Sequence, residues 1–316
     1  MIKGLFAGVS PISQLIMLAF IMMVSVMLFV LTGILIAPVV LGFPYAELMS
    51  IFNNNDAAQY LNLMRYLQTV FHAGLFIIPA FIAAYLFSGQ ATQYLSLSKT
   101  TATSKWFGGV LLLMLAAIPC INLLATLNEM IVFPESLSGL EQRLRDFEEA
   151  ARQTTDLFLK VDHVGGMLFN IFMMAILPAL GEEMIFRGVM QKIFARWTGN
   201  IHVAIIITGF LFSLMHFQFY GFFPRWLLGV MFGYLLVWSG TLWLPIFAHF
   251  VNNTVAVIVS CLIHKEMIPE KVETIGSVWQ DVPLIIVASA ICAWLLWKMY
   301  KSSKIVPETN SGLIHY

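Results

Sequence analysis

This sequence has very little charge. Only 11% of its 316 residues are Asp, Glu, Lys or Arg, and the 17 basic and 17 acidic residues balance to zero. An average soluble domain has roughly 25% charged residues. Hydrophobic residues make up 59% of the chain, and the mean hydropathy is +0.85. These values exclude a soluble globular protein and a disordered chain. They also exclude a nucleic-acid binder that relies on a basic surface, so a polytopic membrane protein remains.

Cysteine is also scarce. Cys120, Cys261 and Cys292 are odd in number, far apart, and placed in or beside apolar segments. Nothing in this pattern indicates a disulfide framework or a cysteine-based metal site. We interpret the three residues as buried thiols that pack as small apolar side chains.

Long apolar runs are abundant. A membrane-spanning helix needs roughly 20 mostly apolar residues. Candidate spans lie at residues 14–38, 66–88, 106–132, 164–196, 200–218, 223–239, 242–263 and 281–300. Tryptophans near the ends of these runs support the boundaries, because indole rings favour the membrane interface. We therefore expect an all-α fold, a polytopic membrane helix bundle of about eight transmembrane helices.

One connection, residues 134–162, is polar. Its apolar residues Leu137, Leu140, Leu144 and Phe147 are three or four positions apart, which predicts an amphipathic helix on the membrane or over the bundle. A solvated linker helix without a function is the alternative. The expected parts of the chain are N-terminal spans (1–133), this connection (134–162), core spans (163–264), and a final span with a basic tail (265–316).

Three charged residues lie inside an apolar stretch. Glu182, Glu183 and Arg187 fall between Val164 and Phe194. Each ionised group inside a span costs about 2.5–3.5 kcal/mol on insertion scales, so such groups are usually paired or functional. Glu183 and Arg187 are spaced to pair on one helix. Glu182 has no partner on its own helix and is a candidate general base. Alternatively, all three form a structural ion cluster.

Later spans add further polar residues at matching depth. If two spans form an antiparallel hairpin turning at Thr198–Asn200, Glu182 lies 16 residues before the turn and His216 lies 16 after it. At about 1.5 Å per residue, the two side chains reach similar depth. His249 and Asn253 are four residues apart on one helix face, and the next hairpin brings them near the same layer.

These residue types suit hydrolysis. A glutamate and a histidine can hold and deprotonate a water molecule, while a histidine and an asparagine can donate hydrogen bonds to the oxyanion. Because no Ser or Cys occupies a nucleophile elbow at this layer, water is the favoured nucleophile. Zinc binding by the same Glu and His side chains stays open, although the H-E-x-x-H pattern of metalloproteases is absent.

The sequence resembles the CAAX protease and bacteriocin-processing (CPBP, or Abi) family of intramembrane proteases. The resemblance covers roughly residues 164–256 and rests on three ordered motifs, E-E-x-x-x-R, F-x-x-x-H and H-x-x-x-N. The matching residues are Glu182, Glu183, Arg187, Phe212, His216, His249 and Asn253.

The resemblance implies a metal-independent, glutamate-type endopeptidase with a membrane-embedded site. By analogy, Glu182 and His216 activate water, and His249 and Asn253 form the oxyanion site. Glu183 and Arg187, with Phe212, support them.

The implied substrate is a membrane-associated peptide or protein, such as a prenylated or bacteriocin-like one. The expected surroundings are the lipid bilayer, specifically the cell (inner) membrane of a bacterium, with no cofactor, metal or nucleic acid.

Two other classes of function compete with the peptidase. One is a non-catalytic scaffold or self-immunity protein that uses the polar layer for binding. The other is a transporter that uses Glu182 as a proton site, which the lack of inverted repeats disfavours.

Overall fold

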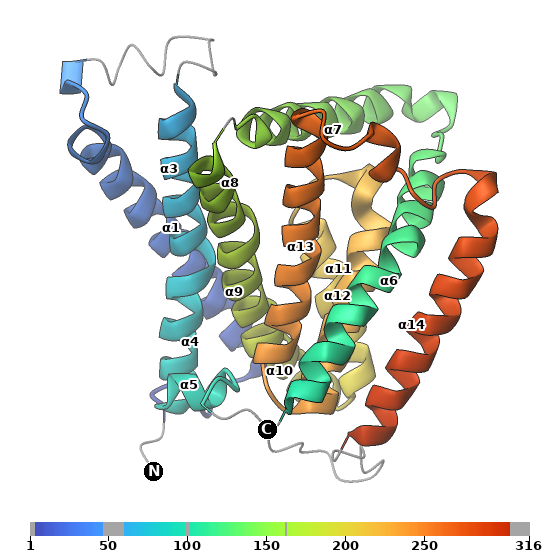
Figure 1. Cartoon of the computed structure of the whole chain (residues 1–316). Helices are drawn as coiled ribbons and strands as arrows, with labels where there is room; N and C mark the ends of the chain where they lie inside the picture. Colours follow the sequence, from blue (N-terminus) through green and yellow to red (C-terminus); the bar gives the residue numbers. More distant parts are fainter. Residues whose placement is uncertain (1–3, 47–59, 99–101, 162, 304–316) are drawn as a thin grey trace.

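The computed structural model describes residues 4–46, 60–98, 102–161 and 163–303, and within these ranges every regular element is a helix (Figure 1). The helices before the core spans are α1 (Pro11–Leu41), α3 (Leu61–His72), α4 (Ile78–Ser88), α5 (Ala91–Tyr94), α6 (Ser104–Glu129) and α7 (Ser138–Leu159). They are followed by α8 (Val164–Ile171), α9 (Leu177–Glu183), α10 (Gln191–Thr198), α11 (Ile201–Leu214), α12 (Phe222–Ser239), α13 (Trp243–His264) and α14 (Val282–Ser302).

Seven helical segments in the described ranges are long and apolar enough to cross a membrane. They are Pro11–Leu41, Leu61–Ser88, Ser104–Glu129, Val164–Thr198, Phe219–Ser239, Trp243–His264 and Trp279–Ser302. The predicted membrane helix bundle is therefore confirmed. The span expected at 200–218 is shorter than predicted, because α11 has only 14 residues. Such a helix is about 21 Å long, less than the roughly 30 Å of a hydrocarbon core.

The segment Val164–Thr198 is one continuous helical element of 35 residues, as its long apolar run predicts. It contains two π-helical turns, η4 (Phe172–Ile176) and η5 (Met184–Met190). A third π-turn, η2 (Ala73–Ile77), joins α3 to α4. Pro79 and Pro178 each follow a π-turn by two residues. Because proline has no N–H to donate, such local widening accommodates the missing helical hydrogen bond.

Helix α7 lies across one end of the bundle, opposite the end where α10 connects to α11 and α12 to α13 (Figure 1). It is attached to the short 3₁₀ turn η6 (Phe219–Gly221). The backbone N–H of Tyr220 donates to Glu148 at 3.2 Å, and the guanidinium of Arg145 lies 4.4 Å from the centre of the Tyr220 ring. Helix α7 therefore covers this end of the bundle.

Close packing of α11 on α12 depends on glycine. A Cβ atom at Gly229 would lie 2.9 Å from the Cα of Gly209, closer than side chains normally approach. A Cβ atom at Gly233 would lie 2.8 Å from Oε1 of Gln191. The small residues allow both helix α11 and the polar side chains of the long helix to reach the α12 backbone.

Candidate active site

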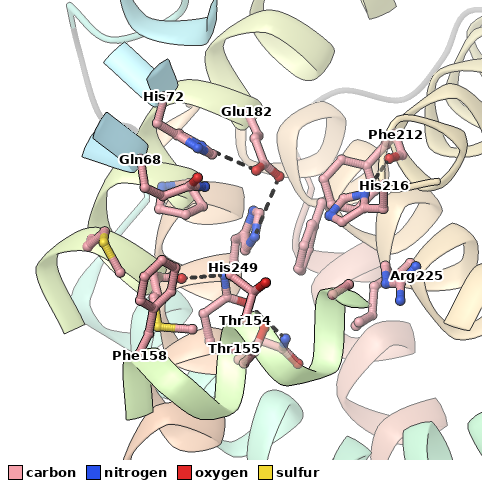
Figure 2. Close-up of a pocket in the computed structure, with 18 of the residues that line it drawn as sticks. Gln68, His72, Thr154, Thr155, Phe158, Glu182, Phe212, His216, Arg225 and His249 are labelled. Carbon is pink, nitrogen blue, oxygen red and sulfur yellow. Dashed lines mark hydrogen bonds and ion pairs between the residues drawn. The ribbon is translucent and has the colours of Figure 1, made fainter. Parts of the chain in front are cut away.

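A cavity of about 620 Å³ lies below α7 and between α3, α9, α12 and α13. Its polar lining consists of Gln68, His72, Thr154, Thr155, Glu182, His216, Arg225, His249, Asn252 and Asn253. The structure thus brings the four expected catalytic residues to one space, with Phe212 in the wall (Figure 2). Their catalytic roles stay predictions.

Glu182 is the carboxylate that faces this cavity. It is the penultimate residue of α9 and is 7% exposed. Its Oε1 lies 3.3 Å from Nε2 of His72, and its Oε2 lies 4.0 Å from Nε2 of His249 (Figure 2). Oε2 has no hydrogen-bond partner within the described part of the chain. Oε1 is therefore closest to His72, whereas Oε2, near His249, is free to accept a proton.

Glu183 and Arg187 form a fully buried ion pair that also contacts His249 of the cavity lining. Oε1 of Glu183 accepts from Arg187 at 2.8 Å and lies 2.9 Å from Nδ1 of His249. The other terminal nitrogen of Arg187 donates to the backbone carbonyl of Gly229 at 2.8 Å. A carboxylate beside Nδ1 requires a proton on that nitrogen. The other ring nitrogen, Nε2, lies 4.0 Å from Oε2 of Glu182.

The ring of His249 is also fixed by aromatic packing. It stacks on Phe232 with ring centres 5.3 Å apart, and Phe212 meets it edge-on at 5.7 Å. Phe212 therefore has a direct structural link to the site, which explains the phenylalanine in the F-x-x-x-H motif.

His216 lies just beyond the end of α11. Its Nδ1 is 2.9 Å from the backbone carbonyl of Phe212, which can only accept. The proton is therefore on Nδ1, and Nε2 is left as the basic nitrogen. The next residue, Phe217, has a left-handed backbone with φ 53°, an uncommon conformation for a bulky residue. This left-handed residue follows the end of α11 at Leu214 and lies beside the site.

Asn253 is held by a backbone irregularity. Pro178 lacks an N–H, and the carbonyl of Met174, four residues earlier, accepts from Nδ2 of Asn253 at 3.1 Å instead. Asn252 in turn donates to Oδ1 of Asn253 at 3.1 Å. One Nδ2 hydrogen of Asn253 is therefore engaged, and the second is available for a ligand in the cavity.

Six polar cavity residues were not predicted from the sequence, and two of them, His72 and Arg225, can carry a positive charge. His72 contacts Glu182 from α3, and Arg225 lies in the wall from α12. Arg225 donates to the carbonyl of Gln218 at 3.1 Å and lies 3.9 Å from Glu148 of α7. His72 had a readable signal, because a histidine inside an apolar span is costly unless it has a partner. Arg225 lies near the start of a helix, and no sequence pattern pointed to it.

This arrangement can hold and deprotonate water. Glu182 and His216 both line one cavity, and Oε2 of Glu182 and Nε2 of His216 are both proton acceptors. Within the described residues, no group of three or more His, Cys, Asp or Glu side chains has a geometry that could hold a metal ion.

Comparisons with known proteins agree with the motifs. Residues 164–255 match the family model of the Type II CAAX prenyl endopeptidases, Rce1-like. The uncharacterized protein YpbD of Bacillus subtilis is 31% identical over 93 residues, which are 27% of this chain and 43% of that protein. The sporulation-killing factor biosynthesis protein SkfC of the same organism is 35% identical over 91 residues, 27% of this chain and 18% of that protein.

The matched segment thus covers less than half the length of either curated relative. No solved structure matches the chain. Residues 164–255, which carry Glu182, His216 and His249, are thus similar to the Rce1-like family of CAAX prenyl endopeptidases.

Proposed function

We propose that the protein is an intramembrane endopeptidase that hydrolyses a peptide bond of a membrane-associated substrate with a water nucleophile. The observation that carries this proposal is the convergence of Glu182 and His216 on one cavity, each with an unused basic atom. Burying a carboxylate and histidines in an apolar bundle is costly, which supports a functional reason for the cluster.

In the proposed mechanism, Oε2 of Glu182 and Nε2 of His216 hold the attacking water, and one of them takes its proton. The resulting hydroxide adds to the carbonyl carbon of the scissile bond. Nε2 of His249 and the second Nδ2 hydrogen of Asn253 are the donors for the oxyanion. Glu183 accepts from Nδ1 of His249 and stabilises its protonated ring. Collapse of the intermediate returns the proton to the leaving amine.

Two kinds of substrate are consistent with the relatives. The matching family is named for prenylated CAAX ends, and SkfC is named for the biosynthesis of a killing factor. We therefore propose a prenylated or bacteriocin-like peptide as the substrate. Both relatives come from Bacillus subtilis, which supports the proposal that the protein lies in the cell membrane of a bacterium.

The test compares wild type with Glu182→Ala and His216→Ala in proteoliposomes. The probe is a farnesylated peptide with a CAAX end, labelled with a fluorophore and a quencher on either side of the expected bond. We expect each substitution to lower kcat by about 10²–10⁴-fold, the usual contribution of a general base. Cleavage by Glu182→Ala at the wild-type rate would contradict the mechanism.

The peptides of cell membranes provide a second measurement that needs no chosen probe. Cells with wild type and cells with Glu182→Ala are compared for peptides whose ends change. A scaffold or immunity protein predicts a different result. In that case the cellular phenotype survives Glu182→Gln and His249→Ala, but is lost when residues 134–162 are deleted.

A further inference from the structure

His72 is a buried histidine that the proposed mechanism does not use. It is the last residue of α3, is 7% exposed, and lies outside the segment that matches the family. Figure 2 shows its ring directed at Glu182. A polar ring within a membrane-spanning helix is expensive unless a partner or a function compensates for its burial.

The contact between His72 and Glu182 joins the first half of the chain to the core. Nε2 of His72 lies within ion-pair distance of Glu182, 3.3 Å from its Oε1, and it has no hydrogen-bond partner among the described residues. The ring packs on Phe76, with centres 4.8 Å apart, which limits its rotation. Glu182 is therefore the polar group that this nitrogen faces.

The two helices are built to come close at this point. A Cβ atom at Gly181, the residue before Glu182, would lie 2.8 Å from Cβ of Phe76 and 3.1 Å from a side-chain carbon of Ile77. Only glycine allows α9 to approach the turn η2 this closely. The π-turn η2 begins immediately after His72, and η5 begins immediately after Glu183. Such turns are frequent at functional sites.

We propose that His72 is a positioning residue for Glu182. It holds Oε1, so that Oε2 faces the water and His249. This inference rests on the proposed function, because it assigns Glu182 the role of the base. A carboxylate with both oxygens unrestrained would rotate among several orientations, and few of these place Oε2 in line with His216 and the substrate.

The experiment compares His72→Gln with His72→Leu, using the farnesylated CAAX peptide in proteoliposomes. The amide nitrogen of glutamine can occupy the place of Nε2, whereas leucine has no donor. We expect His72→Leu to lower kcat by about 100-fold, the usual effect of misplacing a catalytic group by about 1 Å. KM should stay within about twofold, and His72→Gln should recover kcat to within about tenfold of wild type.

The control is Gln14→Leu. Gln14 is 1% exposed and accepts a hydrogen bond from Arg196 at 2.8 Å, near the turn between α10 and α11. This substitution removes a buried polar group far from the cavity and should lower the melting temperature without changing kcat. A purely structural role of His72 would give the pattern of Gln14→Leu.

A second readout needs no substrate. We expect the melting-temperature shifts of His72→Gln and Glu182→Gln to be non-additive in the double variant, because the two side chains are in contact. Additive shifts would contradict an interaction between His72 and Glu182. If His72→Leu does not fold, the double variant of His72→Gln and Glu182→Gln still tests whether the two side chains interact.

The outcomes separate the two proposals. If Glu182→Ala cleaves like wild type, the proposed function fails whatever the His72 variants do. If Glu182→Ala is inactive but His72→Leu keeps kcat within about twofold, the proposed function stands and the role of His72 is wrong. A kcat for His72→Gln as low as that for His72→Leu would also overturn it.

Discussion

Two glutamate–arginine pairs in this protein have the same spacing and different surroundings. Arg187 and Glu183 lie 2.8 Å apart in the long core helix, and both side chains are 0% exposed. Arg145 and Glu141 lie 2.7 Å apart on α7, with side chains 46% and 16% exposed. Because the distances are nearly equal, any difference in what the two pairs contribute to the protein comes from the surroundings of each pair.

On α7 the charges remain solvated, and exposed pairs of this kind contribute little to stability. In the core, neither partner can be hydrated, so the network must satisfy each charge itself. Glu183 also contacts His249, and Arg187 also donates to Gly229. The buried pair therefore fixes the geometry of the site, and whether it stabilises the fold is a separate question.

The largest effect should come from removing one partner of the buried pair. Arg187→Met leaves the Glu183 carboxylate buried without its cation, which usually costs about 3–5 kcal/mol. We expect a large fall in the melting temperature of the protein in detergent. The double variant Glu183→Gln/Arg187→Met should recover much of this loss, because no isolated charge remains.

Arg145→Met is the matched control, since it breaks a pair of equal spacing on α7. Its melting temperature should stay near that of wild type. If Arg187→Met were as mild as Arg145→Met, the core network would have to be reached by water, and the contrast between the two pairs would be lost.

The next largest effect should come from Gly229→Ala. The added methyl group would lie 2.9 Å from Cα of Gly209 and 3.1 Å from the guanidinium of Arg187. Overpacking of this kind typically costs about 1–3 kcal/mol. We expect a lower melting temperature and a lower kcat, because the carbonyl that accepts from Arg187 must move.

Gly108→Ala provides the control for this substitution. Gly108 lies within α6, and an added Cβ atom would have no neighbour within 4 Å. Alanine is the better helix former by roughly 0.5–1 kcal/mol. The expected result is an unchanged or slightly higher melting temperature. Equal destabilisation by both substitutions would argue against close packing at Gly229.

Much of the site was readable from the sequence, because helical spacing and hairpin depth are regular. The i,i+4 rule predicts the contact of Glu183 with Arg187, and equal distance from the Thr198–Asn200 turn predicts that Glu182 and His216 share a layer. The shared cavity agrees with that geometry. These inferences need only the rise of a helix and the position of a turn.

The rest depends on packing between distant segments. His72 precedes Glu182 by more than 100 residues, and no local pattern states that α3 lies against α9. The π-turns before Pro79 and Pro178 change the helix register without a marker in the periodicity. The short length of α11 was also missed, because the apolar run continues past the residue at which the helix ends.

A smaller effect concerns the acid sensitivity of α7. The pKa of Glu141 lies below its usual value because of hydrogen bonds from the Arg145 side chain and the backbone N–H of Phe133. Because the pKa is lower in the folded state, the ionised Glu141 carboxylate stabilises the fold. This stabilisation is complete above the pKa of the unfolded state and is lost as the pH falls through the pKa of the folded state. The melting temperatures of wild type and Glu141→Gln should therefore differ at neutral pH and converge in acid. A difference that grows in acid would contradict this sign.

The smallest effect should come from Arg152→Ala. Arg152 pairs with Glu149 at 2.8 Å and with Asp156 at 2.9 Å, but its side chain is 63% exposed and both partners are about half exposed. We expect no measurable change in melting temperature, and any residual difference should vanish at high salt, where exposed charges are screened.

A clear loss of stability in Arg152→Ala that persists at high salt would show that this face of α7 is not surrounded by water alone. Lipid headgroups are the nearest polar alternative, because α7 lies across an end of a membrane bundle (Figure 1). Comparing melting temperatures in detergent with those in bilayers would then separate the two cases. A lower melting temperature only in bilayers would assign the α7 charges to the membrane surface. A lower melting temperature in both media would mean that the ion pairs of Arg152 stabilise the protein more than their exposure to water predicts.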